Sequence, residues 1–325
     1  MRKEAVLVAA FAAALACSSQ AGSSQAADYP SRPVIWVVPS AGTGSDNSAR
    51  NMAPVLAERL GQPVIVDNRA GAGGIISFQA VAGARPDGYT ILFASSGPLA
   101  AYPHLKKLSY DPATAFTPVH GIGSAPLSLA VNAASPFRTL ADLVAFARAN
   151  PDRLNYGSAG VGSAQHLGAV LLAHDAGIAM THIPYRTTAA TITDLLGGTI
   201  DLTFDVFSVL GSQIEAGRLR ALAVSGAARL PGLPDVPTFI EAGYPGVVFS
   251  AWSVLMAPAG TPPDVVDRLA AAFGQAMRDP RIVAYHSRLG MTTMPDMGPA
   301  ETAAYVTAES ARMKILIERA GIVPE

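Results

Sequence analysis

The chain has 325 residues, which is enough for two domains of ordinary size with a large hydrophobic core. Charged residues make up only 14% and the formal net charge is −1, so the composition does not favour nucleic acid or another polyanion as a partner. Half of the residues are hydrophobic. Beyond the N-terminus, however, no run of about 18 apolar residues occurs, so none of the remaining segments is expected to cross a membrane.

The N-terminus has the pattern of a secretory signal peptide. Basic residues at positions 2 and 3 precede an apolar stretch over 5–16, and small residues follow as far as Ala27. Cleavage after Ala21 or after Ala26 would satisfy the small-x-small rule. We therefore expect residues 1–26 to be a signal peptide and the mature protein to be periplasmic.

Cys17 is the single cysteine, and it lies inside this N-terminal segment. It follows Ala14-Leu-Ala, an imperfect lipoprotein box, so a lipid anchor on Cys17 is the alternative to cleavage. After cleavage the chain would have neither a free thiol nor a disulfide. Its stability in an oxidising compartment would then depend on the core alone.

From Tyr29 onward, short apolar runs alternate with segments whose apolar residues recur at helical spacing. The runs predict strands at Val34–Val38, Val64–Asn68, Thr90–Ala94, Leu127–Val131, Met180–Pro184, Leu202–Asp205, Leu219–Val224 and Trp252–Ala257, with a further short strand beginning at Leu154. Helices are predicted at Asp46–Leu60, Ile75–Ala84, Thr139–Ala149, Thr188–Gly197, Pro263–Arg278, Pro280–Leu289 and Pro299–Ala320, and two more end near Ala176 and Ala216. Such alternation is typical of a parallel sheet with helices on both faces.

Two strand–loop–helix units of similar design occur, one in each half of the chain. In the first, the strand Val34–Val38 leads through a loop of small residues to a helix at Asp46; in the second, residues 154–167 repeat this order. Free backbone N–H groups and the positive end of a helix dipole make such a unit a common anion site. We expect a discontinuous first domain, 28–125 plus 252–325, an inserted second domain, 126–251, and a ligand cleft between them.

The motifs of several enzyme classes are missing. The first glycine loop imitates a dinucleotide fold, but Asn47 stands where the third glycine of the fingerprint is needed, and Gln165 does so in the second loop. No phosphate-binding loop, no Gly-x-Ser-x-Gly elbow and no metal-binding histidine spacing occurs. We therefore predict no cofactor, no metal and no catalytic residue. As an alternative, a secreted hydrolase or ligand-sensing domain would use Ser158 or Ser163 with His166.

Taken in series, the motifs resemble one known family, the extracytoplasmic solute-binding proteins of tripartite tricarboxylate transporters, also called the Bordetella-uptake-gene (Bug) family. The matching segments are Val37-Val-Pro39 with Gly42 and Asp46 to Arg50, Val66-Asp-Asn-Arg-Ala-Gly-Ala-Gly-Gly74, Pro86-Asp-Gly-Tyr-Thr90, Tyr156-Gly-Ser-Ala-Gly160 with His166-Leu167, His182-Ile-Pro-Tyr-Arg186, Thr193-Asp-Leu-Leu-Gly-Gly198 to Asp201, and Leu230-Pro-Gly-Leu-Pro-Asp-Val-Pro-Thr238.

This resemblance implies a type II periplasmic-binding fold, in which two doubly wound α/β domains close on a small organic carboxylate. It also implies delivery of that ligand to the membrane subunits of a transporter, and a protein that is not an enzyme; we expect it to be a monomer. Two departures from the family pattern occur: the first loop is one residue shorter between Pro39 and Gly42, and Thr43 and Thr187 replace glycines. These positions are where ligand preference is expected to differ.

The sequence and the resemblance together give sixteen candidate ligand-binding residues. They lie in the two glycine loops and at predicted strand ends: Ser40, Ala41, Gly42, Thr43, Gly44, Asp46, Arg69, Ser95, Ser158, Ala159, Gly162, Ser163, His166, Tyr185, Arg186 and Asp205. The small residues would donate hydrogen bonds to a carboxylate. For some of the others, two roles are open.

Asp46 either contacts the ligand or only caps its helix, and His166 either contacts the ligand or packs. Arg69 and Arg186 are either counter-charges or members of surface ion pairs. Tyr185 is a candidate wall of the pocket.

Overall fold

The computed structural model describes residues 29–39, 41–319 and 321–322. The expected signal peptide, Cys17 and Ser40 lie outside these residues. Within the described ranges, none of the helices combines the length and the apolar composition needed to cross a bilayer.

The strands form one continuous mixed sheet, in the order β2-β1-β3-β9-β4-β7-β5-β6, with β8 and β10 also paired to β4. Their bounds are β1 Val34–Val38, β2 Val64–Asn68, β3 Thr90–Ser95, β4 Phe116–Asn132, β5 Asn155–Ser158, β6 Thr181–Pro184, β7 Leu202–Val206, β8 Leu219–Val224, β9 Ser250–Pro258 and β10 Thr292–Thr293. β1 runs parallel to β2 and β3, and β5 runs parallel to β6 and β7.

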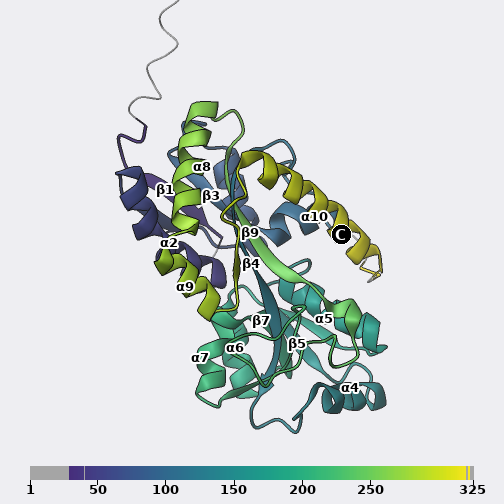
Figure 1. The fold of residues 1–325 in the computed structure, drawn as a ribbon. Coiled ribbons are helices and arrows are strands. Elements are labelled where there is room, and N and C mark those ends of the chain that lie inside the picture. The colour runs from purple at the N-terminus through teal and green to yellow at the C-terminus, as the bar shows by residue number, and fades with distance from the viewer. Residues whose placement is uncertain (1–28, 40, 320, 323–325) are drawn as a thin grey trace, which may run out of the picture.

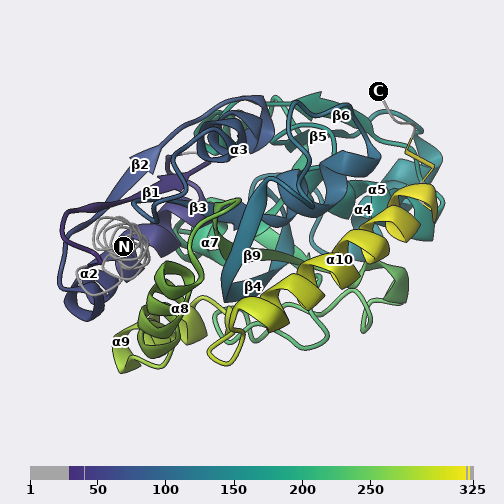
Figure 2. The ribbon, with the colours of Figure 1, turned by 90° about the horizontal axis from the view of Figure 1, so that it is seen from above.

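The helices cover the two ends of this sheet. Their bounds are α2 Gly44–Leu60, α3 Ile75–Ala82, α4 Leu140–Ala149, α5 Ala164–Ala176, α6 Thr188–Gly197, α7 Phe207–Glu215, α8 Pro263–Met277, α9 Pro280–Arg288 and α10 Pro299–Arg319. Figure 1 shows α2, α8 and α9 with β1 and β3 in one half of the molecule, and α4 to α7 with β5 and β7 in the other. In Figure 2, α10 runs along one side of the molecule.

β4 joins the two halves, and sequence patterns identified only its last third. The strand is 17 residues long; Phe116 to Pro126 pair with β9, and the rest pairs with β7 and β8. The first part of β4 does not show a strand pattern in the sequence because it contains several glycines and prolines. Gly123 is needed there because a Cβ at this position would lie 2.7 Å from the Thr292 carbonyl oxygen of β10.

The expected parallel arrangement holds only in part, because β4 and β9 are antiparallel to each other and to the strands on either side of them. A long antiparallel pair therefore separates two parallel groups of strands. The expected domain limits fall side by side on this pair, where Ala125 is opposite Ala251 and Pro126 is opposite Ser250.

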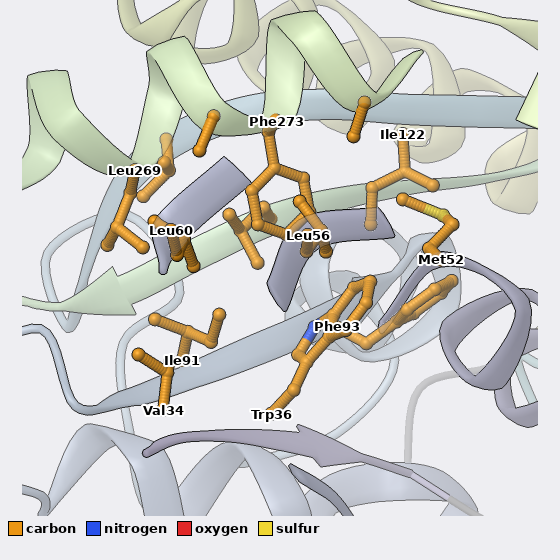
Figure 3. Packing of buried hydrophobic residues seen from close by; sticks show 14 of the residues in the cluster. Val34, Trp36, Met52, Leu56, Leu60, Ile91, Phe93, Ile122, Leu269 and Phe273 are labelled. Atoms are coloured by element: carbon orange, nitrogen blue, oxygen red, sulfur yellow. The ribbon is translucent and has the colours of Figure 1, made fainter. Parts of the chain in front are cut away.

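Each half has its own buried core. In the first half, α2 and α8 pack side by side over the sheet. Figure 3 shows Phe273 of α8 above Trp36 and Phe93, and the Phe273 and Trp36 rings meet edge to face with centroids 5.3 Å apart. In the second half, Phe204 and Phe239 stack at 5.7 Å within a separate cluster. A third cluster joins the halves, because Leu167 of α5 packs in it with Tyr102 and Trp252.

Local capping explains where several helices begin. Thr139 accepts a hydrogen bond from the Asp142 N–H at 3.2 Å, and the Asp142 carboxylate accepts one from the Thr139 N–H at 2.8 Å, which completes the expected capping box. Helix α2 begins at Gly44, two residues before the predicted start, because Thr43 rather than Asp46 is its N-cap. Prolines open α8, α9 and α10 as predicted.

Phe273 offers a direct test of the first core. The substitution Phe273→Ala removes a side chain with no exposed surface that packs on Trp36, so it leaves a cavity between α8 and the sheet. We expect it to lower the free energy of unfolding by about 3–5 kcal/mol, measured by urea denaturation. Phe146→Ala is the matched control, since Phe146 is 39% exposed, and its cost should be much smaller. Equal losses in the two variants would contradict this account of the core.

Candidate ligand-binding site

Strand ends from both halves of the molecule meet at one cavity. Pro39 follows β1 and Ser95 ends β3, whereas Ala159 follows β5 and Asp205 lies at the end of β7; all four residues line the cavity. The carboxyl ends of parallel strands are the usual ligand positions in α/β sheets. The long antiparallel pair β4 and β9 brings two such edges together.

The cavity has a volume of about 200 Å³. This is enough room for several waters or for a small organic molecule. The lining is rich in groups that can donate hydrogen bonds. Its polar side chains are Thr43, Ser45, Ser48, Ser95, Ser96, Tyr102, Ser163, Gln165, Arg186, Thr188, Asp205, Ser208, Trp252 and Ser253.

Four helices begin at this cavity. Gly44 at the start of α2, Ala164 at the start of α5, Thr188 at the start of α6 and Val206, the N-cap of α7, all belong to its lining. The first N–H groups of a helix have no partner within the helix, and the dipole places positive charge there. Because the four N-termini converge, the cavity is electrostatically suited to an anion.

Gly44 also marks a point where the two halves approach each other closely. A Cβ at this position would lie 2.9 Å from Cγ2 of Val206 and 3.2 Å from Oγ of Ser208, both in the other half. Only a residue without a side chain allows α2 and the start of α7 to come this near. The lining of the cavity is therefore continuous across the two halves.

Among the described residues, the cavity lining contains one cation, Arg186, and one acid, Asp205. They do not form an ion pair with each other, and the Arg186 side chain makes no hydrogen bond or ion pair with another described residue. Burial raises the pKa of the Asp205 carboxyl to about 6, against the opposing effect of hydrogen bonds from the Val206 N–H and the Gln165 amide.

An outer cleft adjoins the cavity and shares part of its lining. Gly71, Gly73, Tyr102, Ala159 and Arg186 belong to both. In this cleft the charged side chains from the described residues are Arg186 and Lys106, whose Nζ lies 4.4 Å from the centroid of the Tyr102 ring. The path toward the cavity is therefore positively charged.

Asp46 belongs to the support of the first loop and does not line the cavity. Its side chain accepts hydrogen bonds from the Gly42 N–H and the Asn68 amide, each at 2.9 Å, and forms an ion pair with Arg50 at 2.9 Å. Burial opposes ionisation, but these hydrogen bonds and the Arg50 charge outweigh it, so the pKa of Asp46 lies below its ordinary value. The carboxylate therefore fixes the loop, and Thr43 caps the helix.

Seven of the sixteen candidate residues line the cavity: Thr43, Gly44, Ser95, Ala159, Ser163, Arg186 and Asp205. Ser40 lies outside the described residues. Ala41 and Gly42 are exposed in the loop before α2, and Arg69 forms an exposed ion pair with Asp67 at 2.9 Å. Tyr185 lines the outer cleft, and its hydroxyl donates to Asp194 at 2.7 Å. Asp46, Ser158, Gly162 and His166 lie behind the lining.

Behind the second loop lies an aromatic and histidine cluster. His166 and His182 have ring centroids 4.5 Å apart, and Tyr156 stacks on His182 at 5.0 Å. Nδ1 of His166 accepts a hydrogen bond from the Gly162 N–H at 3.4 Å, so the buried ring supports the loop. Burial, with the nearby charges of His182 and Lys106, lowers the pKa of His166 from 6.5 to about 4.

The serine–histidine pairs considered for a hydrolase are not formed. The Ser163 hydroxyl accepts from the His166 backbone N–H at 3.2 Å as the N-cap of α5, and Oγ of Ser158 lies 2.6 Å from Nε2 of His182 instead. Ser158, His166 and His182 all lie outside the cavity lining. Within the described part of the chain, no group of three or more His, Cys, Asp or Glu side chains is placed to hold a metal.

Several lining residues were missed from the sequence. Ser208 and Gln165 lie in the first turns of α7 and α5, and Trp252 lies on β9 with its Nε1 donating to Glu309 at 2.8 Å. Ser208 follows a strand–helix junction that has no glycine loop. Gln165 attracts attention in the sequence only because it stands where a dinucleotide fingerprint needs its third glycine. A search for polar residues in the first turn of every helix that follows a strand would have found both.

Comparisons with known proteins identify the family that the chain resembles. Residues 48–322 match the family described as "Tripartite tricarboxylate transporter family receptor". A relative from Pseudomonas sp. (strain P51), the "UPF0065 protein in tcbD-tcbE intergenic region", is 39% identical over 307 residues, or 94% of this chain and 91% of the relative.

Solved structures agree along nearly the whole chain. The periplasmic binding protein BugD is 35% identical with a TM-score of 0.87, over 91% of this chain and all of its own. Rpa4515 of R. palustris with adipate is 36% identical with a TM-score of 0.87, over 92% and 100%. MatC of Rhodopseudomonas palustris with bound malate is 32% identical with a TM-score of 0.83, over 89% and 100%.

The fold and the cleft define a periplasmic-binding-protein architecture of two α/β halves, which confirms the predicted fold class. More narrowly, the chain belongs to the family of tripartite tricarboxylate transporter receptors, which confirms the resemblance seen in the sequence. Members of this family are solute-binding receptors and not enzymes.

The lowered pKa of His166 predicts an acid-sensitive fold. Between about pH 6.5 and 4 the unfolded chain binds a proton that the folded protein does not, so this stabilisation is complete above pH 6.5 and is lost as the pH falls toward 4. His166→Asn keeps an acceptor for the Gly162 N–H. We expect the variant to lose about 2 kcal/mol less unfolding free energy than the wild type between pH 7 and 5, measured by urea denaturation.

His174→Asn serves as the control because His174 is an exposed residue of the same helix, and this variant should keep the wild-type difference. If wild type and His166→Asn lose the same amount, the His166 ring does not resist protonation in the fold.

Proposed function

We propose that this protein is an extracytoplasmic receptor that captures a small organic carboxylate in the cavity and delivers it to the membrane subunits of a tripartite tricarboxylate transporter. The observation that carries the proposal is the convergence on one small cavity of four helix N-termini and of Arg186, which pairs with no other described residue. Such an arrangement favours an anion whose oxygens accept hydrogen bonds.

The strength of these contacts is sufficient for a transport receptor. A hydrogen bond to a charged group contributes about 1.5–3 kcal/mol, so three or four, less the cost of ordering, reach the roughly 8 kcal/mol of micromolar binding. The hydroxyls of Ser95, Ser163 and Ser208 are available in the lining besides the helix N–H groups. Since these donors come from both halves, a bound acid would hold the halves together.

The outer cleft supports the same ligand class. Lys106 and Arg186 line it, and no described acid does. A passage of one charge sign raises the local concentration of oppositely charged ligands and speeds their association. Two solved relatives hold adipate and malate, both of which are dicarboxylates, so we propose a short dicarboxylate for this chain.

We propose that the two halves act as domains, 28–125 with 252–325 and 126–251, joined through β4 and β9, and that the protein works as a monomer. The two buried clusters that lie one in each half, around Trp36 and around Phe204, support this division. We also propose export by the N-terminal signal and a periplasmic location. The intact mass of the exported protein would distinguish cleavage after Ala21 or Ala26 from lipidation at Cys17, and an unprocessed chain would contradict export.

Titration calorimetry tests the ligand class. We expect succinate, malate or adipate to bind with micromolar affinity and to raise the midpoint of thermal unfolding, because ligand that binds only the folded state stabilises it. Neutral polyols and sugars of similar size should produce no heat. Binding of a sugar without binding of any acid would refute the anion site.

Gly44→Ala tests whether both halves must close on the ligand. The new Cβ would press on Val206 and Ser208 in the other half, while alanine at the start of α2 is favourable for the helix itself. We expect about tenfold weaker dicarboxylate binding with an unchanged unfolding free energy.

Gly83→Ala, at the end of α3, is the control because its Cβ would lie no closer than 3.6 Å to the Gln79 carbonyl oxygen. Undiminished affinity in Gly44→Ala would show that the close approach of α2 and α7 plays no part in binding.

A further inference from the structure

We propose that Asp205 selects, among small carboxylates, those that carry a hydrogen-bond donor, a hydroxyl or an ammonium group, beside a carboxylate. This inference rests on the proposed function and narrows the substrate class of the same cavity. Asp205 lies at the end of β7, is only 7% exposed and belongs to the cavity lining.

The carboxylate of Asp205 is incompletely paired by the protein. Oδ1 accepts from the Val206 N–H at 2.8 Å, and Oδ2 accepts from the Gln165 amide at 3.3 Å. Each oxygen of a carboxylate has room for a second hydrogen bond. No Arg, Lys or His of the described residues lies within ion-pair distance of Asp205. A bound molecule can therefore donate the further hydrogen bonds that the Asp205 oxygens are able to accept.

Asp205 is also the one acidic side chain among the described residues that line the cavity. The described lining otherwise offers hydroxyls, one amide, one guanidinium and helix N-termini, which hold the carboxylates of a ligand. A buried charge without a cation is costly until a donor approaches it, and the raised pKa of Asp205, about 6, reflects that cost. A second carboxylate in the same cavity adds repulsion, which a donor on the ligand offsets.

An unsubstituted diacid meets Asp205 without a donor. It must then either leave the second acceptor position of each Asp205 oxygen unfilled against a like charge or bind together with a proton. A hydroxy or amino diacid of the same length donates directly to an Asp205 oxygen. Sites that hydrogen-bond a substrate hydroxyl discriminate strongly against the analogue that lacks it. Of the acids held by the two relatives, malate carries such a hydroxyl, whereas adipate, which has a longer carbon chain, does not.

The test uses succinate, malate and aspartate, which share one carbon chain and differ in the substituent. On wild-type protein, titration calorimetry at pH 7.5 should show malate or aspartate binding at least tenfold tighter than succinate. Asp205→Asn exchanges one acceptor oxygen for a donor. We therefore expect it to bring the ratio of dissociation constants close to one, chiefly through tighter binding of succinate.

Asp201→Asn is the matched control. It makes the same chemical change at the start of β7, outside the cavity lining, where Asp201 accepts a hydrogen bond from the Asn155 N–H, and it should keep the wild-type ratio. The wild-type ratio is itself a test, so the inference stays open to refutation even if Asp205→Asn does not fold.

The outcomes separate the two claims. If no acid binds the wild type, the proposed function fails and the inference fails with it. If succinate and its substituted analogues bind the wild type equally well, the protein is a carboxylate receptor and the inference alone is overturned. An unchanged ratio in folded Asp205→Asn would equally overturn the role of Asp205.

Discussion

The pairing of β4 with β9 is the constraint on which the rest of the structure depends. β4 runs through both halves of the molecule, pairing antiparallel with β9 over its first part and with β7 and β8 over its last. Because this pair runs between the halves (Figure 1), the carboxyl ends of β3 and β7 come to the same place. Neither half alone has a cavity of this lining, because each supplies one edge of it together with the helix N-termini at that edge.

This arrangement links ligand binding to the relation between the halves. A ligand shifts an equilibrium between open and closed states only by the difference in its affinity for them. An anion that takes hydrogen bonds from α2 on one side and from α5 and α7 on the other has its full set of contacts only when the halves are close. Gly44 marks the place where the halves are already close, because a Cβ there would lie 2.9 Å from Cγ2 of Val206. Electrostatic attraction from both sides then favours closure.

The sequence predicted the features that arise from local interactions and missed those that depend on partners distant in the chain. The capping box of Thr139 and Asp142 and the proline starts of the last helices are local, and they are present. The first part of β4 was not predicted because the glycine at position 123 is required by a close contact with β10, nearly 170 residues away in the chain. Likewise, no local pattern shows that Ser158 meets His182 or that Asp46 binds Asn68.

The contrast between the two buried acids explains why strand-end and helix-cap patterns could not assign their roles. Asp205 lies at the end of strand β7, just before α7, and Asp46 lies in the first turn of α2, after the loop that follows β1. The oxygens of Asp46 are occupied by Gly42, Asn68 and Arg50, so its pKa is lowered and it holds one loop in place. Asp205 forms no ion pair with a cation of the described ranges, its pKa is raised, and it lines the cavity. The same residue type thus stabilises a loop of the fold in one half. In the other half it offers carboxylate oxygens that can accept a hydrogen bond from the ligand.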